Sequence, residues 1–176
     1  ANRGVSTPDL VIRTKKKPLI TLLPGAGALD AFRHDARQRV ADYIADYKSY
    51  FARCDALDDV QRTILDPMPR VALVPGLGLF GMGRSHKEAK IAADIAEIWI
   101  EAVTGAERIG RFTALPDEEL FKLEYWSLEQ SKLKSITYEP FSGQIVVVTG
   151  GGGAIGAATA KVFASEGAHV AVLDLD

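Results

Sequence analysis

The chain has 176 residues, of which 47% are hydrophobic and 25% charged, and its formal net charge is −2. This is the composition of a soluble globular protein, and without a basic half the chain offers little to attract nucleic acid or an anionic membrane. No apolar stretch approaches the roughly 20 residues of a membrane span, and a single cysteine, Cys54, precludes an internal disulfide and fits a reducing compartment. We therefore expect a cytoplasmic protein that acts on a small molecule and binds neither nucleic acid nor membrane.

The first residues are polar and end in three consecutive lysines, Lys15 to Lys17. A run of this kind is more often a solvated turn than a binding patch, and we interpret it as one. The apolar run Leu19–Leu23 precedes Pro24 and Gly25, which predicts a strand that leads into a turn.

A long amphipathic helix is predicted from Asp30 onward, because apolar and aromatic residues recur there at spacings of three and four. The residues on this face are Phe32, Ala36, Val40, Tyr43, Tyr47, Tyr50 and Cys54. We expect them to pack in the core with the tyrosine hydroxyls at its rim, rather than to form a ligand-stacking surface. Cys54 is then a buried, inert thiol.

A glycine-rich stretch in the middle of the chain predicts a hairpin. Val71–Val74 has the pattern of a buried strand, and in residues 75–83 glycines alternate with large apolar residues, as in a tight turn before a short second strand. No GK[ST] sequence follows, which excludes a nucleoside-triphosphate loop.

The next predicted helix begins with a capping box, in which Ser85 is the N-cap and Glu88 lies three residues later. We expect it to end at Gly105. Its predicted apolar face consists of Ile91, Ile95, Trp99 and Ala102, with Ala92, Ala96 and Val103 beside it.

Pro116 and the acidic residues after it predict a further helix, since proline and negative charge both favour a first turn. Lys132 and Lys134 complement the C-terminal end of this helix. Residues 135–143 contain Pro140 and Gly143 and are interpreted as a linker. We predict two domains, residues 1–143 and residues 144–176.

Residues 1–143 show no catalytic or metal-binding pattern. The chain's three histidines, His34, His86 and His169, are far apart and lack the spacing of zinc ligands. There is no GxSxG elbow and no cysteine–histidine pair that the sequence could justify. We predict no metal site.

Residues 144–176 have the pattern strand, glycine-rich turn, helix, strand, acidic residue. Ile145–Val148 is a continuous apolar run, typical of a parallel strand buried on both faces. The predicted helix carries Ile155, Ala158, Val162 and Phe163 on one side and ends at Gly167, and the second strand, His169–Leu173, ends at Asp174.

This pattern predicts a dinucleotide site. The N–H groups at the start of the helix can bind a pyrophosphate, and a carboxylate at the end of the second strand can accept hydrogen bonds from an adenosine ribose. Gly151, Gly153 and Gly156 match GxGxxG, and Asp174 follows Gly156 by 18 positions, near the usual spacing of about 20. The predicted cofactor-binding residues are Gly150, Gly152, Gly153, Ala154, Ile155, Gly156, Asp174 and Leu175.

The segment Thr149–Gly156, TGGGGAIG, resembles the TGxxxGIG turn of the short-chain dehydrogenase/reductases. It departs from that motif at Ala154, where the family has a glycine, and we expect a slightly tighter pocket as a result. The resemblance implies an α/β fold, with residues 144–176 as the first unit of a Rossmann-type, doubly wound parallel sheet, and a nicotinamide cofactor. Asp174 favours NAD because it would repel the 2′-phosphate of NADP, and Leu175 supplies no positive charge.

Four further segments extend the resemblance over nearly the whole chain: Thr7–Lys15, Tyr50–Cys54, Val74–Gly78 and Leu123–Trp126. Together with the glycine-rich turn, they are similar to the bifunctional rhamnulose-1-phosphate aldolase/short-chain dehydrogenases. The resemblance implies that residues 1–143 are an α/β module like a class II aldolase and connect to the dehydrogenase. In the aldolase motif a histidine ligates zinc, but here that position is Leu77, so we expect a module without metal.

Three functions remain open. The first is an NAD-dependent short-chain dehydrogenase that oxidises an alcohol or aldehyde, such as lactaldehyde, in deoxy-sugar breakdown; the resemblance also implies a homo-oligomer. The second is a non-catalytic nucleotide-binding or docking module, and the third is a class II aldolase.

No tyrosine is followed four residues later by lysine, so the catalytic Tyr-x-x-x-Lys of the dehydrogenases is not in this sequence and no catalytic residue can be named. One βαβ unit is less than a nucleotide-binding domain needs, and we expect the remainder elsewhere.

Overall fold

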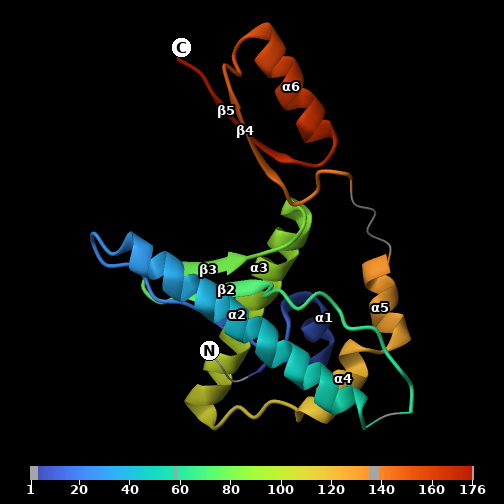
Figure 1. The fold of residues 1–176 in the computed structure, drawn as a ribbon. Helices are drawn as coiled ribbons and strands as arrows, with labels where there is room; N and C mark the ends of the chain where they lie inside the picture. The colour runs from blue at the N-terminus through green and yellow to red at the C-terminus, as the bar shows by residue number, and fades with distance from the viewer. Residues whose placement is uncertain (1–3, 58, 135–138, 176) are drawn as a thin grey trace.

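The computed structural model describes residues 4–57, 59–134 and 139–175 and shows a mixed α/β chain with two small sheets (Figure 1). In the first sheet β1 (Leu19–Ile20) runs parallel to β2 (Val71–Val74), which pairs antiparallel with β3 (Gly78–Gly81). In the second sheet β4 (Ile145–Thr149) is parallel to β5 (His169–Leu173). No helix of the described residues is long and apolar enough to cross a membrane.

The core of the first sheet is formed with the long helix α3 (His86–Ile109), which packs against β2 and β3. The buried residues of this core are Val5, Val11, Val71, Ala92, Ala96, Trp99, Val103 and Leu120. The indole of Trp99 also donates a hydrogen bond of 2.6 Å to the carbonyl of Gly4, which fixes the start of the chain against α3. The hairpin predicted around residues 75–83 is confirmed.

A second core is largely aromatic. Tyr47, Tyr50 and Cys54 on α2 (Leu29–Asp55) pack against Phe121 and Tyr125 at α4 (Asp117–Glu124). The long helix is confirmed, as is the buried cysteine, whose thiol pKa is raised by burial. The N-terminal half of α2 has no buried residue, so only the C-terminal half of the predicted apolar face contributes to the core.

The predicted end of the helix that begins after Ser85 is wrong. α3 passes through Gly105 and ends only before Gly110. Gly105 is exposed with open space around it, and because the good helix formers Ala106, Glu107 and Arg108 follow it, a single glycine does not break the helix. The buried face is also rotated from the predicted one and consists of Ala92, Ala96, Trp99 and Val103.

The helix predicted from Pro116 to Lys134 is broken into two, α4 and α5 (Ser127–Lys134). The chain leaves the helix at Tyr125, whose backbone has φ −103° and ψ 13°. This turn directs Tyr125 into the aromatic core, where its ring stacks on Phe121 at 4.5 Å. Burial of a large aromatic ring outweighs the few tenths of a kcal/mol per residue by which helix propensities differ. Pro116 is the N-cap of α4.

The first strand, β1, is shorter than the predicted strand Leu19–Leu23.

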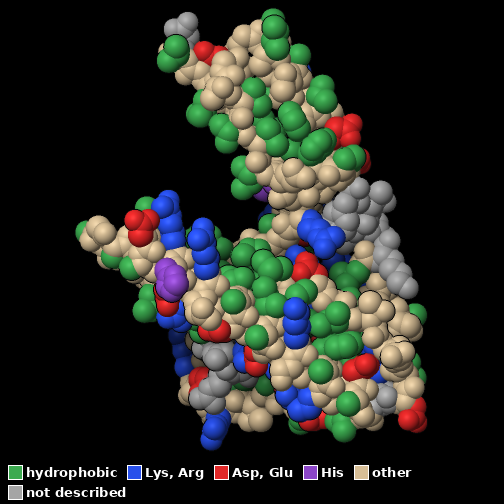
Figure 2. All heavy atoms as spheres, in the orientation of Figure 1, with side chains coloured by type: hydrophobic (Ala, Val, Ile, Leu, Met, Phe, Trp, Pro, Cys, Tyr) green, Lys and Arg blue, Asp and Glu red, His purple; other side chains and the backbone are tan. Residues whose placement is uncertain are grey.

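The C-terminal unit has the predicted order, with α6 (Ala154–Ser165) between the two parallel strands and a left-handed Gly167, φ 91°, after the helix. The prediction that Ile145–Val148 is buried on both faces is wrong. Ile145 is 78% and Val147 56% exposed, because among the described residues α6 alone packs extensively on these two strands. Apolar side chains therefore lie on the surface of this unit (Figure 2). The predicted linker falls partly on residues 135–138, which lie outside the described residues.

We predict opposite effects for two glycine-to-alanine substitutions. A Cβ at Gly81 would collide with the backbone of Ala89 on α3, so Gly81→Ala should destabilise the protein by about 1–3 kcal/mol. A Cβ at Gly105 would meet nothing within 4 Å, so Gly105→Ala should stabilise it by about 0.5–1 kcal/mol. Denaturant unfolding measures both. Equal effects of the two substitutions would contradict the close packing of β3 on α3.

Candidate functional site

The three lysines do not form a solvated turn. Lys15 follows α1 (Val11–Thr14) and is only 3% exposed. Its Nζ lies 3.3 Å from Oε1 of Glu124, which is fully buried, and 4.0 Å from the ring centroid of Tyr47. Lys15 also has φ 64°, a left-handed backbone conformation that a side chain other than glycine adopts only when its surroundings hold it there.

The two lysines that follow are also paired. Lys16 lies 3.0 Å from Asp117 and 4.5 Å from the ring centroid of Tyr50, and Lys17 lies 3.0 Å from Asp46. The run therefore attaches the N-terminal segment to α2 and α4. Sequence reasoning missed this role because the partner carboxylates lie far along the chain.

A chain of hydrogen bonds extends from Glu124 through the tyrosines. The hydroxyl of Tyr47 donates to Glu124 at 2.8 Å and lies 2.8 Å from the hydroxyl of Tyr125, which accepts from the Leu65 N–H at 3.2 Å. The expectation that the tyrosine hydroxyls of α2 lie at the rim of the core is therefore wrong for Tyr47. Tyr50 is buried as well, and neither its hydroxyl nor the Glu124 Oε2 has a hydrogen-bond partner of normal geometry among the described residues.

Burial shifts the pKa values of this network so that its groups stay neutral or paired. It raises the pKa of Tyr125 to about 12. It also raises the pKa of Tyr43, Tyr47 and Tyr50 above the usual range, and the charge of Glu124 adds to the effect. Burial lowers the pKa of Lys15, which the pairing with Glu124 opposes. No tyrosine here can ionise near neutral pH, so this network is structural.

The glycine-rich turn brings the predicted cofactor residues together at one end of the C-terminal unit. Gly150 has φ 66°, and Gly153 is the N-cap of α6 without a capping side chain. Gly152, Gly153, Ala154 and Ile155 are exposed on the turn and the first turn of the helix. Asp174 lies against them, since its Oδ2 accepts the Gly152 N–H at 2.6 Å.

Glycine is required at several positions of this turn by close packing. A Cβ at Gly151 would collide with Val172, one at Gly156 would collide with Gly150, and one at Gly152 would lie 2.9 Å from Asp174. The absence of side chains therefore lets the turn pack closely on β5 and leaves its outer surface as bare backbone. Leu175, the last predicted cofactor residue, donates its N–H to Asp174 at 2.7 Å and is exposed.

Among the described residues, no group of three histidine, cysteine, aspartate or glutamate side chains comes close enough to hold a metal ion. Leu77, at the position of the aldolase histidine, is 60% exposed in the hairpin turn.

Comparison with known proteins places the chain in a family. Residues 1–133 match the family described as "Aldolase class II, second domain", and the chain belongs to this family. It is also 34% identical over 175 residues to "Uncharacterized oxidoreductase YuxG" of Bacillus subtilis (strain 168). That alignment covers 98% of this chain and 25% of the relative, so the chain spans a quarter of the relative's length. No solved structure matches. The predicted aldolase-like part is confirmed.

We predict that the buried ion pair behaves unlike the exposed pairs. Glu124→Gln leaves the Lys15 charge buried without its counter-ion and should destabilise the protein by about 3–5 kcal/mol. The double variant with Lys15→Met should lose less than the sum of the two single variants. As a control, Lys90→Met breaks the exposed pair between Lys90 and Asp94 and should change the free energy of unfolding by less than about 1 kcal/mol. Additive single effects would show that the pair is not coupled.

We also predict that stability falls steeply with pH above about 10. Tyrosines in the unfolded chain have the ordinary pKa of 10.0 and lose their protons there, whereas the four folded tyrosines keep theirs, so the unfolding free energy decreases as pH rises. Lys15 acts in the opposite sense, because its lowered folded pKa makes stability rise with pH up to the ordinary lysine pKa of 10.5, but this is the effect of one group, whereas four tyrosines act in the other direction. Urea unfolding at several alkaline pH values should show that Tyr47→Phe removes about one proton, or about 1.4 kcal/mol per pH unit, from the slope.

Proposed function

We propose that this chain joins two parts of a larger enzyme, in which a class II aldolase-related domain precedes an NAD-dependent short-chain dehydrogenase. In this proposal residues 144–176 begin a Rossmann-type sheet, and the enzyme oxidises an alcohol or aldehyde, such as lactaldehyde, in the breakdown of deoxy-sugars such as rhamnose. The observation that carries the proposal is the pairing of the bare glycine turn with Asp174 at the end of the adjacent parallel strand.

The two halves of the dinucleotide would be held by different groups. The N–H groups of Ala154, Ile155 and Gly156 in the first turn of α6, with the positive end of the helix dipole behind them, would bind the pyrophosphate. The carboxylate of Asp174 would accept hydrogen bonds from the adenosine ribose. Bound NAD supplies the hydride acceptor.

The preference for NAD rests on charge. A carboxylate next to the ribose 2′ position repels the phosphate that distinguishes NADP, and Leu175 offers it no cation. The name of the relative, an oxidoreductase, agrees with a redox reaction. The catalytic tyrosine and lysine of the resembled dehydrogenases are not in this sequence, so this chain contributes the cofactor side of the site only.

Aldol cleavage is the second candidate, favoured by the match of residues 1–133 to the aldolase family. Because the described residues bring no metal-binding group together, this chain would support such an activity as a docking or structural module, and the metal ligands would come from another part of the enzyme.

We predict that Asp174→Ala weakens NAD binding by the intact protein about tenfold or more, since it removes charge-assisted hydrogen bonds to the ribose. NADP binding should not weaken, because the repulsion of its 2′-phosphate is removed. Calorimetric titration of both nucleotides measures this change in preference.

The control for this titration is Asp94→Ala, which removes an exposed carboxylate from α3 and should leave both affinities unchanged. A damaged turn would weaken NAD and NADP alike. Absence of NAD binding to the wild type would sink the dehydrogenase proposal.

A further inference from the structure

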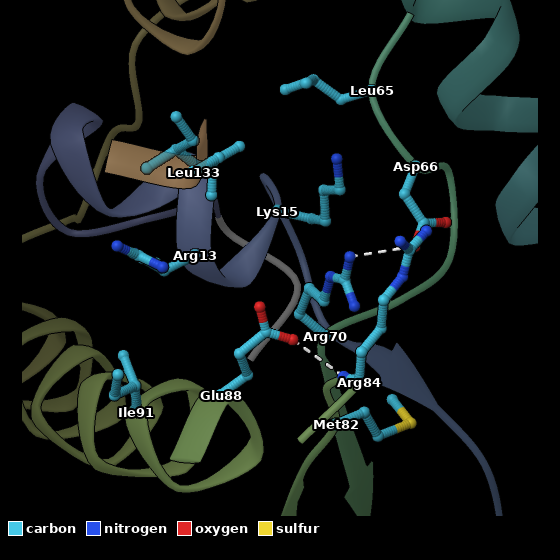
Figure 3. Close-up of a pocket in the computed structure, with 11 residues that line it drawn as sticks. Arg13, Lys15, Leu65, Asp66, Arg70, Met82, Arg84, Glu88, Ile91 and Leu133 are labelled. Carbon is cyan, nitrogen blue, oxygen red and sulfur yellow. Dashed lines mark hydrogen bonds and ion pairs between the residues drawn. The ribbon is translucent and has the colours of Figure 1, made fainter. Parts of the chain in front are cut away.

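A partly enclosed cavity of about 200 Å³ lies within residues 12–133, apart from the glycine turn (Figure 3). Its wall is assembled from five separate segments: α1, residues 65–70, residues 82–84 after β3, α3 and α5. A volume of this size holds a molecule of a few carbons, since water takes about 30 Å³ per molecule.

Charged side chains from four of these segments line the cavity. The guanidinium groups belong to Arg13, Arg70 and Arg84, and the carboxylates to Asp66 and Glu88. Asp66 lies 2.9 Å from Arg70 and 3.7 Å from Arg84, so one carboxylate lies against two cations. Three positive groups against two negative ones leave the lining with an excess positive charge.

Two of these charged groups also make hydrogen bonds with the backbone. Glu88 accepts the backbone N–H of Arg84 at 2.8 Å as part of the α3 N-terminus, and Arg13 donates to the carbonyl of Lys132 at 3.3 Å. Lys15 also contributes to the wall, but its charge is matched by Glu124 outside the cavity. The positive field of Arg70 reaches Lys15, where it helps to lower the lysine pKa.

Apolar side chains form the rest of the lining, among them Ile12, Met82 and Ile91. A cavity lined by both guanidinium groups and apolar side chains suits an oxyanion on a short carbon chain, because arginine binds carboxylate and phosphate oxygens through paired N–H groups.

We propose that this cavity binds a small organic anion, with the carboxylate or phosphate group held by Arg70 and Arg84 and the carbon chain against Met82 and Ile91. The site is separate from the glycine turn, so it can fail while dinucleotide binding stands, and the reverse.

The test is a calorimetric titration of the intact protein with two probes, inorganic phosphate and butyrate. At least one should bind saturably, and the better probe identifies the head group. Arg84→Gln should weaken that binding about tenfold or more. The matched control is Arg33→Gln, which removes an equally exposed guanidinium from α2 (62% exposed, against 54% for Arg84) outside the cavity and should bind as the wild type does. Equal affinities of the two variants, or no saturable binding of either probe, would overturn the proposal.

A second variant tests the site independently, in case the Arg84→Gln protein does not fold. Leu133→Glu places a carboxylate on the cavity wall from α5 and should weaken the same probe by repulsion, more at low salt than at high salt. Unchanged binding in a folded Leu133→Glu protein would contradict the site even if Arg84→Gln cannot be studied.

Discussion

The ion pair between Lys15 and Glu124 is the contact on which the first part of the structure depends. It joins residues separated by 109 positions and lies where the N-terminal segment, α2 and α4 meet. Through Tyr47 and Tyr125 the same network reaches the Leu65 backbone. The pair therefore holds the N-terminal segment against α4, together with the neighbouring contact between Lys16 and Asp117.

A buried ion pair is a poor source of net stability, since the desolvation of two charges offsets most of their attraction. Apolar side chains of similar volume would serve the core as well. What the pair adds here is specificity of position: only one placement of the N-terminal segment gives Lys15 its carboxylate. The left-handed backbone at Lys15 fits this view, because a strained residue persists only where its side chain is held.

Features with local causes could be predicted from the sequence. The hairpin at residues 75–83 and the Ser85 cap depend on neighbours within a few residues, and both are found in the structure. The burial of Cys54 and the strand His169–Leu173 follow from the pattern of apolar residues around them and are found as well. The role of the lysine run could not be predicted, because its pattern is that of a solvated turn and its partners are distant. The helix break at Tyr125 likewise depends on the aromatic core, which propensity does not describe.

The glycine turn shows why geometry alone does not separate a binding loop from a structural one. Close packing explains Gly151 and Gly156 without any ligand, since a side chain at either position would collide with the unit itself. Asp174 is different. Its carboxylate accepts the backbone N–H groups of Gly152 and Leu175. A neutral side chain could accept these hydrogen bonds and cap the turn equally well. A purely structural turn therefore does not require a negative charge at this position, whereas a ribose site does.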